Sequence, residues 1–143
     1  MTRTSQCTCR GRDHPLKEAS TQILKLAAAR PEPFFTDAEV LQELLQHYLA
    51  LRTWPRGKRA VTDFAELMRG RIEPIYGEDV ESAASLAEKY APLLAARDLL
   101  HAAVMLRVGA ERIVSADVDF DHLAPEGILR LDPMGFSEWR EGL

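Results

Sequence analysis

Apolar residues recur along the chain in segments that alternate between helical and strand-like spacing. Between His14 and Ala29 they follow the i, i+3, i+4 spacing of one face of a helix. The same periodicity predicts further helices from Thr36 or Asp37 to about Leu51, from Lys58 to Met68, from Glu78 to Tyr90 and from Ala95 to Val108. Short apolar runs predict strands at Phe34-Phe35 and over residues 71–75, 111–115 and 128–131.

Proline and glycine mark where these segments end. The run Arg30-Pro31-Glu32-Pro33 ends the first helix, Trp54-Pro55-Arg56-Gly57 is expected to form a turn, and Gly109 suits a helix C-cap. Alternating strands and helices predict a parallel sheet covered by helices. In such sheets the functional site lies outside the carboxyl ends of the strands. Asp37 and the acidic run after Ser115 both follow such ends.

Bulk composition narrows the class of protein. The chain has 143 residues, of which 46% are hydrophobic and 28% charged, as in an ordinary globular domain. A net charge of -4 argues against a broad basic surface for nucleic acid, but leaves room for a local basic groove. No apolar run approaches a membrane span, and residues 1–6 lack the apolar stretch of a signal peptide, so the cytoplasm is expected. The only cysteines, Cys7 and Cys9, are too close together for a disulfide framework.

Several acidic residues stand beside apolar ones. Glu43 interrupts a helical apolar face, Asp98 opens an apolar helix, and the acidic run 117–121 follows a predicted strand. Clustered carboxylates repel one another unless a cation lies among them, and hard oxygen ligands favour Mg²⁺ or Mn²⁺. Such ions support phosphodiester hydrolysis. Each acid alone equally fits a structural role, Glu43 as a half-exposed helix residue, Asp98 as a first-turn acid and the run 117–121 as a solvated loop.

Taken together, the segments resemble the PIN-domain family of VapC-type toxin ribonucleases, from Gly11 to Trp139. The family's second acidic residue lies in a helix after a short strand, a context similar to Phe34-Phe35-Thr36-Asp37-Ala38-Glu39-Val40-Leu41-Gln42-Glu43. Its third opens a buried helix, as in Ala95-Ala96-Arg97-Asp98-Leu99-Leu100-His101. Its fourth follows a strand, as in Ile113-Val114-Ser115-Ala116-Asp117-Val118-Asp119.

The resemblance implies both a fold and an activity. The expected fold is a three-layer α/β/α sandwich with a short, mostly parallel sheet. The expected activity is metal-dependent cleavage of RNA, with Glu43, Asp98 and Asp117 as catalytic residues. The same three acids, helped by Asp119, are expected to hold Mg²⁺ or Mn²⁺. Members of the family are commonly homodimers neutralised by a small antitoxin protein, and no membrane partner is expected.

The N-terminal segment departs from the family pattern. Family members usually begin with a buried strand that ends in Asp-Thr-Asn-Val, whose aspartate is the first metal ligand. Here Thr2-Arg3-Thr4-Ser5 stands in that place, with no acid and no apolar strand. The codons GAC ACG AAC GTC, read one base later, encode Thr-Arg-Thr-Ser, which suggests that about the first ten residues are out of frame. Residues 1–10 are therefore expected to be disordered and residues 11–143 to form the domain.

Three basic residues are candidates for contact with nucleic acid. Arg97 precedes Asp98, and Arg56 and Lys58 lie beside Trp54, where RNA could meet both charge and an aromatic ring. A solvated turn explains Arg56 and Lys58 equally well. His101 is interpreted as a core histidine with a satisfied hydrogen bond. One alternative to a nuclease is a non-catalytic PIN scaffold that binds an antitoxin or RNA without cutting. A third interpretation is an unrelated α/β binding domain with coincidental acids.

Overall fold

The computed structural model describes residues 4–6 and 14–143. Its strands are β1 (Thr4–Gln6), β2 (Thr36–Asp37), β3 (Ile72–Glu73), β4 (Arg112–Val114) and β5 (Leu129–Leu131). Its α-helices are α1 (His14–Ala29), α2 (Ala38–Ala50), α3 (Trp54–Leu67), α4 (Gly77–Tyr90), α5 (Ala96–Val108) and α6 (Phe136–Trp139). Three 3-10 helices are η1 (Val118–Glu126), η2 (Pro133–Gly135) and η3 (Arg140–Gly142). Within the described residues, no helix combines the length and apolar character that crossing a membrane requires.

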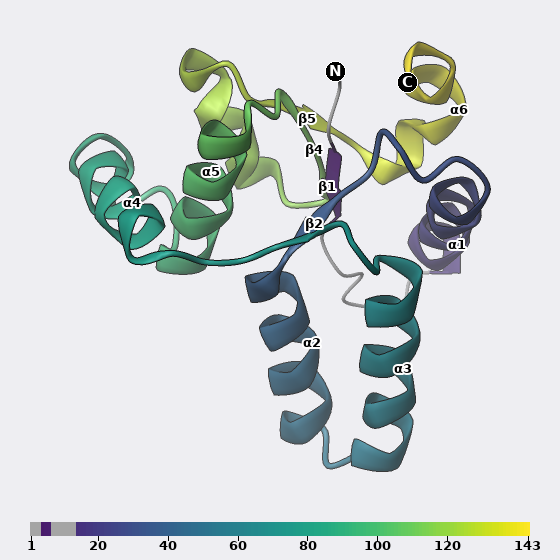
Figure 1. Ribbon diagram of the computed structural model, residues 1–143. Helices are drawn as coiled ribbons and strands as arrows, with labels where there is room; N and C mark the ends of the chain where they lie inside the picture. Colours follow the sequence, from purple (N-terminus) through teal and green to yellow (C-terminus); the bar gives the residue numbers. More distant parts are fainter. Residues whose placement is uncertain (1–3, 7–13) are drawn as a thin grey trace.

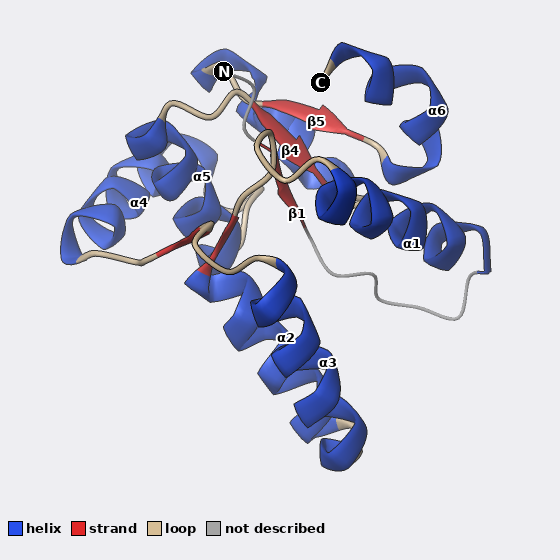
Figure 2. Ribbon diagram, turned by 45° about the vertical axis from the view of Figure 1, so that its right-hand side comes forward, coloured by secondary structure: helices blue, strands red, loops and turns tan. Residues whose placement is uncertain are grey.

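Every strand pair among the described residues is parallel. β4 lies between β1 and β5, and β2 pairs separately with β3. In Figure 1, α4 and α5 lie on one side of the strands and α1 and α6 on the other, while α2 and α3 form a hairpin that projects away from them. Figure 2 shows the same projecting hairpin from a second direction. The expected three-layer α/β/α fold with a short parallel sheet is confirmed.

Two apolar clusters hold these layers together. The first is built around α5, whose Ala102, Val104 and Met105 are fully buried, and it includes Phe120 from η1. The second joins α1 to the C-terminal helices through Ile23, Phe34, Met68 and Phe136. Because α5 is buried on most of its surface, polar residues on it, such as Asp98 and His101, must find partners inside the protein.

Most predicted boundaries are close to those observed, and three differ. The strand expected at Phe34-Phe35 lies two residues later at Thr36–Asp37, because both phenylalanines are in apolar clusters instead. The run 54–57 opens α3 rather than forming a turn, since Pro55 suits the first helical turn. The acidic loop expected over residues 116–121 is largely part of η1, which Asp117 caps.

The N-terminal segment contains a strand that the sequence pattern did not predict. Residues 4–6 form β1, paired in parallel with β4 so that Ser5 is opposite Ile113. Parallel pairing uses backbone amides and carbonyls, which every residue here supplies, so polar side chains do not prevent it. Residues 1–3 and 7–13, which include Cys7 and Cys9, lie outside the described residues. The disorder expected over residues 1–10 can therefore be compared with the structure only at residues 4–6.

Candidate metal and catalytic site

The first part of the site is set by a buried aspartate at the junction of β2 and α2. Asp37 is the N-cap of α2, and its Oδ1 accepts a hydrogen bond of 3.0 Å from the backbone N–H of Val40. Its side chain is entirely buried. The cap fixes where α2 begins, and therefore where Glu43 lies, one to two turns further along the helix.

His101 connects that junction to α5. Its Nδ1 lies 2.7 Å from Oδ2 of Asp37, and its Nε2 lies 3.3 Å from Oε1 of Glu43. Burial on its own lowers the pKa of His101, but the hydrogen bonds to the two carboxylates outweigh it and raise the pKa to about 10. The imidazole is therefore protonated at neutral pH, so that both ring nitrogens donate.

Asp98 lies at the start of α5, in the third helical position. Its Oδ2 accepts a hydrogen bond of 3.2 Å from the backbone N–H of Ala95. Burial raises the pKa of this carboxyl, the Ala95 N–H opposes that rise, and the negative charge of Asp117 adds to it. Asp98 and Asp117 are 19 positions apart in the sequence, and their carboxyl groups lie near enough for the charge of one to raise the pKa of the other, Asp98.

Asp117 is held at the carboxyl end of β4. It is the N-cap of η1, its Oδ1 accepts a 2.9 Å hydrogen bond from the N–H of Asp119, and its own N–H donates to Oγ of Ser115 at 3.0 Å. The side chain of Asp119 is exposed and has no partner within the described part of the chain. Asp121 is different, because Arg130 binds it at 2.9 Å.

The donor chemistry suits a hard divalent cation, although the carboxylates do not converge fully. Asp98 and Asp117 form a pair of repelling carboxylates, which is the arrangement that a cation relieves. Glu43 is paired instead with His101 and with Arg97, whose Nε lies 3.6 Å from Glu43 Oε1. Across residues 4–6 and 14–143, no group of three or more His, Cys, Asp or Glu side chains is arranged to hold a metal ion. The residues therefore fit such an ion in kind: Asp98 and Asp117 interact through their charges, and Glu43 is held by the neighbours Arg97 and His101 of Asp98.

The predicted basic residues fall in two places. Arg97 lies beside Glu43, at the acids themselves. Arg56 lines an open cavity of about 420 Å³ between α1 and the α2–α3 hairpin. That cavity is lined by Lys17, Tyr48, Arg56, Arg59, Ala60 and Asp63. Lys58 is exposed and is not among these lining residues.

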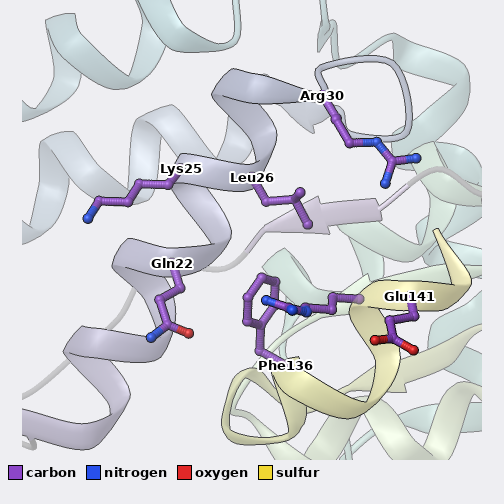
Figure 3. Close-up of a pocket in the computed structure, with 7 residues that line it drawn as sticks. Gln22, Lys25, Leu26, Arg30, Phe136 and Glu141 are labelled. Carbon is purple, nitrogen blue, oxygen red and sulfur yellow. The ribbon is translucent and has the colours of Figure 1, made fainter.

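A further cavity lies between α1 and the C-terminal helices. It has a volume of about 510 Å³, and Figure 3 shows the side chains around it, among them Lys25, Arg30, Phe136 and Glu141. None of the predicted acids lines it. It is therefore separate from the candidate site.

Sequence reasoning underestimated two residues. His101 is a buried histidine with satisfied hydrogen bonds, as predicted, but one of its partners is the predicted ligand Glu43. Asp37 was expected at the start of a helix and after a strand end, but not as a partner of His101. Glu39, half-buried on α2, also belongs to this region: burial raises its pKa, the charge of His101 opposes the rise, and Glu43 adds to it. The spacing of Glu39 and Glu43, one helical turn, was the available signal.

Comparison with known proteins identifies the family. The PIN domain model matches residues 9–125, and the chain therefore belongs to the PIN domain family. "Ribonuclease VapC23" of Mycobacterium tuberculosis is 37% identical over 115 residues, which cover 78% of this chain and 83% of the relative. "Ribonuclease VapC13" of Mycobacterium tuberculosis is 36% identical over 124 residues, which cover 85% and 89%. An unrelated α/β domain with coincidental acids is thereby excluded.

Solved structures agree on the fold. The complex of FitAB with an IR36 DNA fragment has a chain that matches with a TM-score of 0.65 at 18% identity, over 92% of this chain and 95% of that one. VapBC2 from Rickettsia felis, bound to a promoter DNA fragment, matches with a TM-score of 0.63 at 13% identity, over 92% and 98%. At these identities the similarity shows the fold alone.

Proposed function

We propose that this protein is a metal-dependent RNA endonuclease of the VapC toxin type. The observation that carries the proposal is the electrostatic coupling of Asp98 to Asp117: the charge of Asp117 raises the pKa of Asp98. His101, three residues after Asp98 on α5, binds Glu43, which brings the third acid to the same end of that helix. This arrangement occurs in a PIN domain whose relatives are named ribonucleases. A site of this kind requires no nucleophilic side chain.

Glu43, Asp98 and Asp117 are the residues that would hold Mg²⁺ or Mn²⁺, with Asp119 as a further oxygen donor. When bound, such an ion lowers the pKa of water and stabilises charge on a phosphodiester. The chain's own residues prepare the acids for this role. Ser115 fixes the backbone at Asp117, and the Ala95 N–H orients Asp98. Arg97, beside Glu43, is placed to contact a phosphate of the RNA.

The wider RNA contact would involve the end of the α2–α3 hairpin at which the two helices are joined. Arg56, Lys17 and Arg59 line one cavity, and Lys58 is exposed on the same first turns of α3. None of these four cations forms an ion pair within residues 4–6 and 14–143. Unpaired cations in a protein of net charge -4 favour an anionic partner, which here is the RNA backbone.

The family also suggests how the protein is controlled. The relatives are named VapC ribonucleases, and the structural neighbours include the complexes VapBC2 and FitAB, so a small antitoxin protein is the proposed binding partner. We further propose that the chain forms a homodimer and acts in the cytoplasm. Size-exclusion chromatography with light scattering tests the dimer directly, because a monomer at micromolar concentration would contradict it.

The N-terminus is the feature that limits the proposed activity. Thr2-Arg3-Thr4-Ser5 supplies no carboxylate where the family's first ligand is expected, so metal binding should be weaker than in a chain with Asp-Thr-Asn-Val there. Calorimetry with Mn²⁺ and cleavage of a labelled RNA, on both versions of the chain, test the proposal. Asp98→Asn is the inactive control. Cleavage that needs Mn²⁺ in the restored version, and disappears with Asp98→Asn, supports a nuclease.

One observation favours a second candidate, a non-catalytic PIN scaffold that binds an antitoxin or RNA. Glu43 is already paired with two cations, His101 and Arg97, and within the described residues no three acids converge on one point. The same experiment separates the two candidates. If neither version binds Mn²⁺ or cleaves RNA, while both still bind RNA, the scaffold replaces the nuclease as the proposed function.

A further inference from the structure

We propose that Asp37 and His101 form a positioning bridge that holds Glu43 of α2 in place relative to Asp98 of α5. The inference rests on the proposed function, since it concerns two of the acids assigned to the metal. Neither bridge residue would contact the metal or the RNA. Both would act through Glu43, and so they are positioning residues rather than catalytic ones.

The two oxygens of Asp37 have separate partners. Oδ1 accepts from the N–H of Val40 and so fixes the first turn of α2, whereas Oδ2 accepts from Nδ1 of His101. One buried side chain therefore sets the start of the helix that carries Glu43 and, at the same time, binds the helix that carries Asp98. A shift of either helix along its axis would break one of these hydrogen bonds.

His101 uses both ring nitrogens within this bridge. Nδ1 donates to Asp37 and Nε2 donates to Glu43, and the imidazole itself is only 4% exposed. His101 follows Asp98 by nearly one helical turn, so the ring projects from the same end of α5 as that acid. Here the second nitrogen binds the carboxylate that the proposed site uses.

A second buried carboxylate, which also binds a side chain of α5, offers a matched comparison. Asp79, near the start of α4, accepts from the N–H of Tyr76 with one oxygen and from Nε of Arg107 with the other, at 2.8 and 2.9 Å. Asp79 is 2% exposed and Arg107 lies in the last turn of α5. This bridge has the same construction, a helix-start aspartate bound to α5, but it touches none of Glu43, Asp98 and Asp117. It serves stability without serving the site.

The test uses double variants, because removing one member of a buried pair can unfold the protein. Asp37→Ser with His101→Met retains a side chain that can cap α2 and leaves no buried charge without a partner. Asp79→Ser with Arg107→Met is the control. Asp37→Asn is the conservative variant, since its amide can cap α2 and donate to His101, which then donates to Glu43 through Nε2. All variants are made in the chain as it stands and in the version with Asp-Thr-Asn-Val restored.

Two measurements are made on each variant. The first is Mn²⁺ binding by calorimetry in the restored version. There the Asp37/His101 double variant should bind Mn²⁺ at least about 10-fold more weakly than its parent. The control should bind as its parent does, and Asp37→Asn should lie between the double variant and the parent. The second is a crystal structure of each metal-free variant. Compared with the parent, the Glu43 carboxylate should move in the Asp37/His101 double variant and stay in place in the others.

The outcomes separate this inference from the proposed function. A Glu43 carboxylate that stays in place in the Asp37/His101 double variant overturns the positioning bridge, whatever the metal does. Unchanged Mn²⁺ affinity in that variant overturns it as well. If the restored parent binds no Mn²⁺, the proposed function fails, and the crystal structures still decide whether the bridge holds Glu43.

Discussion

Gly57 of α3 packs directly against Tyr48 of α2, so closely that a Cβ at position 57 would lie 2.3 Å from the Cβ of Tyr48. The glycine lies in the first turn of α3, beside the loop that joins the two helices of the projecting hairpin. Tyr48 and Arg56 line the basic cavity at the same place. The absence of a side chain at position 57 thus determines the spacing of helices that carry both the acid Glu43 and the basic residues.

Gly57→Ala should destabilise the protein by about 1–3 kcal/mol, because the added methyl group would push α2 and α3 apart. Chemical denaturation followed by circular dichroism measures this change. Gly77→Ala is the matched control, since nothing lies within 4 Å of a Cβ there and alanine favours the helix. Equal stability of Gly57→Ala and the parent would show that the helices adjust without strain.

Asp98→Asn should remove metal-dependent cleavage and yet stabilise the metal-free protein by about 0.5–2 kcal/mol. Burial and the charge of Asp117 both disfavour ionised Asp98, and asparagine removes that charge while its oxygen can still accept from Ala95. Thermal unfolding in the presence of a chelator measures the effect. Asp79→Asn, which weakens a buried ion pair with Arg107, should have the opposite sign. A loss of stability in Asp98→Asn would indicate a structural acid.

The stability of the metal-free protein should fall as the pH rises from about 7 to 10. His101 has a pKa of about 10 in the folded protein and 6.5 as the ordinary value, so the folded state binds the extra proton. Such a group stabilises the folded state fully at a pH below its pKa in the unfolded chain. This stabilisation is lost as the pH rises through its pKa in the folded protein. The loss should exceed about 1.4 kcal/mol, the value of one pKa unit.

Urea denaturation at a series of pH values measures this dependence. The double variant of Asp37 and His101 should show a flatter profile over the same range, since it lacks the proton that the bridge holds. A parent profile no steeper than that of the double variant would mean that His101 is neutral in the folded protein.

Arg56→Ala and Lys58→Ala should each weaken RNA binding and make it less dependent on salt. Each lost contact with a single strand should lower the slope of log K against log salt by about 0.7. Fluorescence anisotropy in an Asp98→Asn background measures binding without cleavage. Lys25→Ala, which removes an exposed cation of the separate cavity in Figure 3, is the control. Slopes unchanged by Arg56→Ala and Lys58→Ala would remove the hairpin from the RNA contact.

The sequence alone determined the five longer helices, α1 to α5, and the parallel character of the sheet, and it proposed the residue types of the site. Periodicity placed α1 at its observed bounds, and Gly109 ends α5 with a positive φ of 71°, as its C-cap role predicts. These features depend on near neighbours in the chain, so local pattern carries them. The resemblance to PIN domains, which the family match bears out, singled out Glu43, Asp98 and Asp117 as the acids.

Only the tertiary structure decided how those acids are connected. The hydrogen bond from His101 to Asp37 joins positions 64 apart, and the one to Glu43 joins positions 58 apart. Nothing in the local pattern distinguishes a histidine that packs from one that bridges two carboxylates. The strand β1 was missed for a related reason, because its pairing with β4 depends on the backbone and on a distant partner rather than on its own polar side chains.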